Sequence, residues 1–217
     1  MRLSRSLFVT TLLLACFAAW GCLRPKRAPD PSKSYVLSSL PPEAAAGLEG
    51  THDLGLGIAQ VEIPAYLRDL RLVMRKGSSE VHYLENHRWA ERLDRGVQRV
   101  VGANLATLLG TGGVALSAWR RQAVAAELYL AIHRFEYDES GHVTVEVRWQ
   151  VTTPGAERAL LTRHSRFSRP VSPGPHRLDH SVSEMSQAIA DLSREIAMAL
   201  PKALATAAAP GAAPQPQ

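Results

Sequence analysis

Residues 85–98, ENHRWAERLDRGVQ, combine a histidine, carboxylates and arginines within a short stretch. His87 and Glu91 are four residues apart, and in a helix this spacing places two side chains on the same face. A histidine and a carboxylate so placed could exchange a proton with a substrate or hold a metal ion. Either chemistry needs a further partner, and the sequence does not indicate one.

A structural interpretation explains more residues of the same stretch. Its charged members fall on the side of the expected helix that faces away from Leu93 and Val97: Arg88, Glu91, Arg92 and Arg95. Glu91 and Arg95 would then form an exposed ion pair worth roughly 0.2–0.5 kcal/mol. Trp89 would fill the seam between this helix and the preceding strand. We therefore interpret the stretch as an architectural corner.

The other histidines form a weaker candidate site. His176 and His180 are four residues apart, and His164 could join them around a metal ion. However, Pro175 and a capping Asp179 favour a loop that leads into a helix.

The glycine-rich stretches do not match nucleotide-binding loops. Residues 55–57 lack the third glycine of a dinucleotide loop, and residues 110–113 follow a helix instead of opening one. We expect residues 110–113 to end that helix in a left-handed turn. No nucleophile elbow is present. The sequence therefore predicts no catalytic residue, no metal site and no cofactor.

Length and composition indicate one globular domain. The chain has 217 residues, 46% of them hydrophobic, which is enough for a substantial core. The net charge of +5 is mild, and the arginines lack the interleaved aromatic residues of a nucleic-acid surface. Both cysteines, Cys16 and Cys22, lie near the N-terminus, so an internal disulfide framework is excluded.

The first 21 residues are similar to a lipoprotein signal peptide. A basic start precedes the apolar residues 7–20, which are too few to span a membrane because a span needs about 20 residues. Cys22 follows a small residue and is the candidate for lipidation, with Cys16 as the alternative. A plain secreted protein or an uncleaved anchor is the other explanation. Leu23 stands where an inner-membrane retention signal would place Asp, which favours the outer membrane.

Periodicity predicts an α+β domain over residues 34–204. A flexible, lipid-anchored tether (22–33) precedes it, and a disordered Ala/Pro tail (205–217) follows. The expected strands are 34–40, 53–64, 70–76, 79–85, 125–138, 142–153 and 157–169. The expected helices are 90–109 and 179–204, with Pro201 kinking or ending the second. This order predicts a mostly antiparallel sheet with two amphipathic helices packed on one face.

The clearest strand is 142–153, in which valines and Trp149 alternate with polar residues. Its partner loses the alternation near His133–Arg134, which predicts a bulge. We expect the helices to cover the apolar face. We hypothesise that the polar face, with Arg148 and Arg163, contacts a partner protein or a second copy, because arginine is favoured at interfaces. An ordinary solvated face is the alternative.

The order of several motifs resembles the ABC-type transport auxiliary lipoprotein family, which includes the PqiC lipoproteins. The motifs are Val61–Leu67, Arg75–Gly77 and Arg88–Leu93, followed by the hairpin that contains Trp149 and by the last helix. The residues that carry this structural signature are Pro64, Tyr66, Leu67, Trp89, Leu93 and Trp149. The resemblance spans residues 35–200.

The resemblance implies a non-enzymatic, membrane-anchored periplasmic lipoprotein that serves an ABC/MCE-type intermembrane lipid transport system. Its partners would be an MCE-domain protein and the ABC permease and ATPase, and the chain could also form a homo-oligomer. Two other functions stay open. One is a periplasmic carrier of lipids or lipoproteins with its own cavity, and the other is a His-dependent periplasmic hydrolase.

Overall fold

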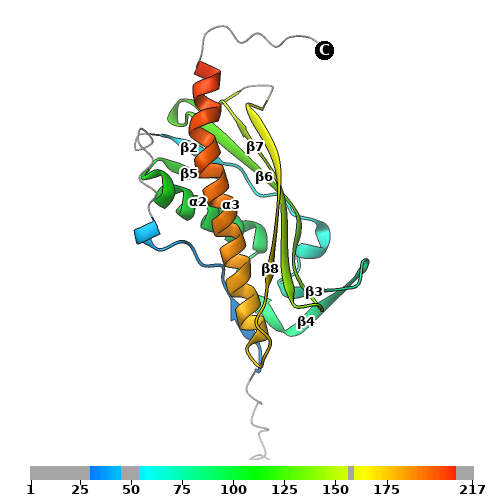
Figure 1. The fold of residues 1–217 in the computed structure, drawn as a ribbon. Coiled ribbons are helices and arrows are strands. Elements are labelled where there is room, and N and C mark those ends of the chain that lie inside the picture. Colours follow the sequence, from blue (N-terminus) through cyan, green and yellow to red (C-terminus); the bar gives the residue numbers. More distant parts are fainter. Residues whose placement is uncertain (1–29, 45–53, 156–158, 209–217) are drawn as a thin grey trace, which may run out of the picture. The chain divides into compact units, whose positions relative to one another are not determined.

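The computed structural model describes residues 30–44, 54–155 and 159–208 (Figure 1). Cys16, Cys22, the expected signal peptide and most of the expected tether lie outside these residues, as does the end of the expected tail. The strands and helices described below belong to one unit, residues 32–217.

Three long strands form the antiparallel centre of the sheet: β6 (Ala126–Asp138), β7 (His142–Thr152) and β8 (Leu161–Pro170). The β6–β7 register shifts between Ile132 and Arg134, which confirms the predicted bulge. Because the bulge adds one residue, Ile132 and Phe135 are both buried although an odd number of positions separates them.

Two strands share the other edge of β6. The start of β6 pairs in parallel with β2 (Leu56–Ile58), and its end pairs in parallel with β3 (Arg71–Lys76). β4 (Glu80–Trp89) forms a hairpin with β3, while the short β1 (Lys33–Tyr35) and β5 (Val114–Leu116) pair with β4 and β2. The described residues thus form a mixed sheet of eight strands whose longest ladders are antiparallel. Short 3-10 helices are η1 (Pro42–Ala44), η2 (Ala65–Leu67) and η3 (Arg121–Ala123).

Two helices, α2 (Leu93–Leu109) and α3 (Arg177–Ala208), pack against each other on one side of the sheet, and α3 lies along β7 and β8 (Figure 1). This arrangement confirms the predicted α+β class. Gly110 ends α2 with a φ of 64°, in the left-handed conformation expected there. Pro201 removes one main-chain donor but does not end α3, so residues 205–208, expected in the tail, are helical.

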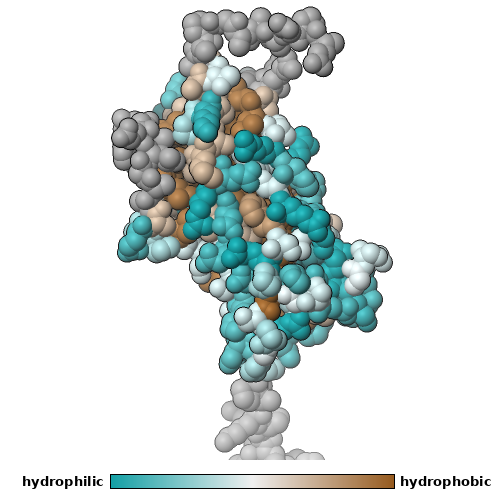
Figure 2. All heavy atoms as spheres, viewed as in Figure 1, coloured by the Kyte–Doolittle hydropathy of each residue, from teal (hydrophilic) through white to brown (hydrophobic). Residues whose placement is uncertain are grey.

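The core lies between β6–β8 and the two helices. Its centre is the apolar face of β7, whose members are all fully buried: Val143, Val145, Val147, Trp149 and Val151. Each such side chain contributes about 1.5–3 kcal/mol by leaving water. The surface on the α3 side is mostly hydrophilic in the lower half of Figure 2, and hydrophobic residues reach it beside the upper half of α3. Among the described residues no helix has both the length and the apolar character to cross a membrane.

Several predicted boundaries were wrong. β4 continues to Trp89 and α2 begins only at Leu93, so His87 and Trp89 lie in a strand and not at a helix start. The reason is that β1 pairs in parallel with the last residues of β4, a long-range contact that extends the strand. The expected strands 34–40 and 53–64 shorten to β1 and β2, and β5 was not predicted.

Candidate functional site

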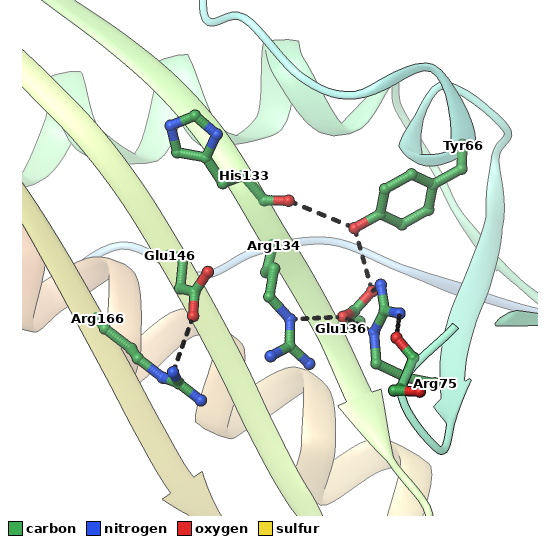
Figure 3. A network of polar contacts seen from close by, with 8 residues as sticks. Tyr66, Arg75, His133, Arg134, Glu136, Glu146 and Arg166 are labelled. Carbon is green, nitrogen blue, oxygen red and sulfur yellow. Dashed lines mark hydrogen bonds and ion pairs between the residues drawn. The ribbon is translucent and has the colours of Figure 1, made fainter. Parts of the chain in front are cut away.

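Pro64–Leu67, which belong to the first motif of the family resemblance, form a corner between β2 and β3. Pro64 directly precedes η2, and Leu67 is buried in the core. The Tyr83 hydroxyl donates a 3.2 Å hydrogen bond to the main-chain oxygen of Tyr66. These contacts fix the path of the chain, and the Tyr66 side chain points toward β6 (Figure 3).

Tyr66 joins a network of polar groups on β6. Its hydroxyl lies 3.1 Å from Glu136 Oε2, to which it donates a hydrogen bond, and 3.4 Å from the main-chain oxygen of His133 (Figure 3). Burial raises the pKa of the Tyr66 phenol, and the nearby Glu136 charge raises it further. Tyr66 is therefore a hydrogen-bond donor over the ordinary pH range.

Glu136 is the centre of this network, and its side chain is completely buried. Two guanidinium groups neutralise it. Arg75 from β3 donates through Nε to Oε1 and through Nη2 to Oε2, and Arg134 donates through Nε to Oε1 at 2.8 Å. The hydrogen bonds to Glu136 raise the pKa of Arg75. Each carboxylate oxygen thus accepts two hydrogen bonds, and the arginines replace the hydration that burial removes.

The Glu136 network holds the sheet together. Arg75 and Glu136 come from two strands that pair over only a short parallel register, so their ion pair reinforces the β3–β6 contact. All four hydrogen bonds to Glu136 come from within the protein, which leaves its oxygens poorly placed to accept a substrate proton. Glu136 was not predicted as a functional residue, because its only signal in the sequence is a carboxylate between Phe135 and Tyr137 in a long strand.

The acid–base pair considered at 85–98 does not form. His87 Nδ1 lies 2.9 Å from the Tyr35 hydroxyl, whose hydrogen goes to Asp179 at 2.8 Å, so His87 is the donor to Tyr35. Glu91 pairs with Arg99, at 2.6 Å between Arg99 Nη2 and Glu91 Oε1. The expected Glu91–Arg95 pair was wrong. Glu91 lies before the start of α2, so the spacing of four residues within a helix does not apply to it, and its side chain contacts Arg99 in the second turn of α2.

His164 and His176, which were considered for one metal site, have different neighbours. The His164 ring lies 5.8 Å from the His133 ring, edge to face, and His176 Nδ1 lies 3.3 Å from Asp179 Oδ2. Across the part of the chain that the structure describes, no three His, Cys, Asp or Glu side chains gather as metal ligands would.

The two tryptophans of the structural signature are buried. Trp89 packs edge to face on Phe135, with 6.1 Å between ring centroids. Trp149 is completely buried, and its Nε1 donates a 3.0 Å hydrogen bond to Ser165. Leu93, the first residue of α2, is buried in the same core.

Arg148 and Arg163 lie on opposite faces of the sheet, which corrects the expectation that they share one surface. Arg163 is paired with Trp149 in the β7–β8 ladder, its guanidinium lies 5.8 Å from the Trp149 ring, and it approaches Glu195 of α3 at 3.5 Å. It therefore lies on the helix side. Arg148 is exposed on the other side, opposite His164.

We call the side of β6–β8 opposite α2 and α3 the outer face. It carries the Glu136 network and the Arg166–Glu146 ion pair, at 3.2 Å (Figure 3). Nearer the start of β6 a shallow hollow of about 200 Å³ is present. Its lining includes Gln60, Glu62, Tyr129, Ala131, Arg148 and Gln150. Of these residues, only Arg148 was predicted from the sequence to lie at an interface.

A family model described as the ABC-type transport auxiliary lipoprotein component matches residues 35–197, from the end of β1 to well within α3. The chain belongs to this family. The matched range of the auxiliary lipoprotein contains all six residues of the structural signature, but it does not include Cys22. No curated protein matches the sequence.

Solved structures share the fold of this auxiliary lipoprotein. Protein XCC0632 from Xanthomonas campestris is 15% identical with a TM-score of 0.68, and the match covers 81% of this chain and 98% of that one. Another, described as an uncharacterized protein, is 20% identical with a TM-score of 0.63, and the match covers 78% of this chain and 99% of that one. Identities this low show the fold alone.

Proposed function

We propose that this auxiliary lipoprotein is a non-enzymatic accessory component of an ABC/MCE-type system that moves lipids between the two membranes of a bacterial envelope. The observation that carries the proposal is the family match over residues 35–197. Its partners are then an MCE-domain protein and the ABC permease and ATPase.

The same proposal places the protein at the periplasmic side of the outer membrane. Lipidation of Cys22 anchors it, residues 22–33 act as the tether, and Leu23 favours the outer over the inner membrane. Anchoring through a lipid is compatible with the described residues, among which no helix is long and apolar enough to cross a membrane.

A carrier with its own cavity is less well supported. Open hollows on the surface of the described residues include ones of about 200, 230, 260 and 530 Å³, none of them enclosed. The largest is lined mainly by polar groups, among them Arg68, Arg92 and Asp94. Such walls do not suit an acyl chain, because charged groups beside hydrocarbon lose hydration without compensation.

A histidine-dependent hydrolase is also less well supported. His87 donates to Tyr35, His176 contacts Asp179, and His133 and His164 contact each other. His142 Nδ1 lies 3.1 Å from the Ser140 hydroxyl, but that hydroxyl donates its hydrogen to Asp138. In none of these sets does a histidine bridge a nucleophile and a carboxylate, the arrangement that nucleophilic catalysis uses.

Affinity purification tests the proposed function. The tagged protein, extracted from membranes with mild detergent, should enrich the permease, the ATPase and the MCE-domain protein together. A tagged unrelated lipoprotein, expressed to the same level, serves as the control. Recovery of the tagged protein without any of the three would contradict the assignment. Stoichiometric lipid bound to the pure protein, seen by native mass spectrometry, would favour the carrier instead.

A further inference from the structure

One row of residues crosses the outer face beside the hollow. The Glu62 amide donates to the Leu130 carbonyl at 2.9 Å, and the Ile132 amide donates to the Glu62 carbonyl at 2.8 Å, so Glu62 bridges to Ala131. Ala131 in turn pairs with Arg148 of β7. Directly paired residues point to the same face of a sheet. Glu62 and Arg148 therefore stand on either side of the small Ala131 side chain.

Glu62 and Arg148 are exposed, and neither side chain has a hydrogen-bond or ion-pair partner in the described part of the chain. Their neighbours differ in this respect. Arg134 is bound to Glu136, and Arg166 is bound to Glu146. The outer face thus satisfies its charges internally toward the end of β6 and leaves one anion and one cation unpaired around the hollow.

The hollow is poorly suited to a small molecule. Its volume of about 200 Å³ is below the range of roughly 300–1,000 Å³ that is usual for ligand sites, and it is open to solvent. Its rim carries Tyr129, which is 38% exposed, and Arg148. Tyrosine and arginine are the residues that protein interfaces favour.

We propose that the outer face docks on the outer face of a second copy of this chain, with Glu62 of each copy paired to Arg148 of the other. A two-fold axis that runs along β6 above Ala131 exchanges the two sides of the row, so it places each anion over a cation. An axis perpendicular to the strands would instead place like charges together. The surface is therefore self-complementary in only one of these orientations, as an isologous interface requires.

The size of the surface makes this association weak. Three strands of about ten residues, with a rise of about 3.3 Å and a spacing of about 4.8 Å, cover on the order of 500 Å². A standard interface buries about 800 Å² on each partner. We therefore expect a reversible dimer whose population rises with protein concentration.

Charge exchange tests the pairing. Sedimentation velocity of the full chain in density-matched detergent should show a mass that rises toward that of a dimer. Arg148→Glu and Glu62→Arg should each weaken dimerisation at least about tenfold, because like charges then face each other. The double variant Glu62→Arg/Arg148→Glu should restore it to within about threefold of the original, since opposite charges meet again. Lys202→Glu, an exposed charge reversal on α3, is the control and should change nothing.

Each other outcome contradicts the proposal. If the protein is monomeric at every concentration, no second copy docks on the outer face. Association that survives both single charge reversals places the contact elsewhere, and an assembly larger than a dimer excludes the closed two-fold pair. Association that the single variants abolish and the double variant does not restore contradicts the pairing of Glu62 with Arg148. Unchanged circular dichroism and thermal unfolding establish that the variants are folded.

Discussion

The Tyr35 hydroxyl donates a 2.8 Å hydrogen bond to the Asp179 carboxylate and so joins β1 to the first turn of α3. His87 of β4 bonds to the same hydroxyl, and Lys33 lies 3.5 Å from Asp179. β1 is only three residues long, and the expected tether directly precedes it. This cluster therefore holds the end of the domain that the anchor would load.

The raised pKa of Tyr35 predicts that the folded protein loses stability at alkaline pH. Burial, with the bond to Asp179 adding to it, raises the pKa of Tyr35 to about 12 from its ordinary value of 10. Above pH 10 the unfolded chain loses this proton while the folded chain keeps it, so the contribution is complete below pH 10 and disappears as pH rises through 12. Tyr35→Phe should cost about 1 kcal/mol near pH 7 and flatten the decline in this window, as measured by urea unfolding.

Tyr129→Phe is the matched control, because Tyr129 also has a raised pKa and bonds to a carboxylate, Glu127, but lies far from β1 in the fold's strand order. Only Tyr35→Phe should speed proteolysis within residues 30–35. At acid pH the contribution of this bond to stability has the opposite dependence on pH, because there it is Asp179 that titrates. The bond from Tyr35 is the main cause that lowers the pKa of Asp179, so its contribution is present above pH 3.8 and is lost as pH falls further. Equal proteolysis of both variants would show that Tyr35 does not secure β1.

Trp89→Ala should lower the free energy of unfolding by about 3–5 kcal/mol, since the ring is buried and packs on Phe135. His87→Ala should cost about 1 kcal/mol, because the His87 side chain is half-buried and loses one hydrogen bond to Tyr35. Chemical denaturation measures both. A Trp89→Ala protein as stable as the parent would refute the account of this corner.

Glu136→Ala should destabilise the fold by about 3–5 kcal/mol, because it leaves the Arg75 and Arg134 charges beside a buried void. Glu146→Ala is the control on the next strand. Its pair with Arg166 is partly exposed, so we expect a loss of about 1 kcal/mol or less. Equal losses of stability in the two variants would mean that the buried Glu136 network stabilises the fold no more than the partly exposed Glu146–Arg166 pair does.

Cys22→Ala should leave the protein without a lipid and shift it from the membrane to the soluble periplasmic fraction. Metabolic labelling with palmitate and fractionation measure the two effects. Cys16→Ala is the natural control and should keep both label and membrane association. Label that persists in Cys22→Ala and disappears in Cys16→Ala would move the anchor to Cys16.

Local patterns predicted the parts of the fold that local contacts determine. The alternation in 142–153 and the interruption at His133–Arg134 identified β7 and the bulge, because both depend on neighbours in the chain. The end of β4 was missed because its partner, β1, is distant in sequence. Arg163 was placed on the wrong face because its own strand alternates only weakly. Leu161 and Phe167, which share its face and pack against the core, are the only two large apolar side chains of β8.

The candidate surfaces were even less visible in the sequence. Glu62 and Arg148 become neighbours of one residue, Ala131, only through a parallel bridge and an antiparallel ladder. Glu136 acquires its partners from β3 and from the corner at Tyr66. Charge pairing across strands depends on register, and composition alone does not report it.

Phospholipid exchange between the inner and outer membranes tests the central claim, that this auxiliary lipoprotein serves a lipid-transport system. The rate should be measured with labelled phospholipid in cells that lack the protein, in cells that lack the ATPase, and in cells that lack both. We expect the same reduced rate in all three strains, and we expect the intact protein to restore exchange in the first. Normal exchange without the protein, beside reduced exchange without the ATPase, would contradict the central claim.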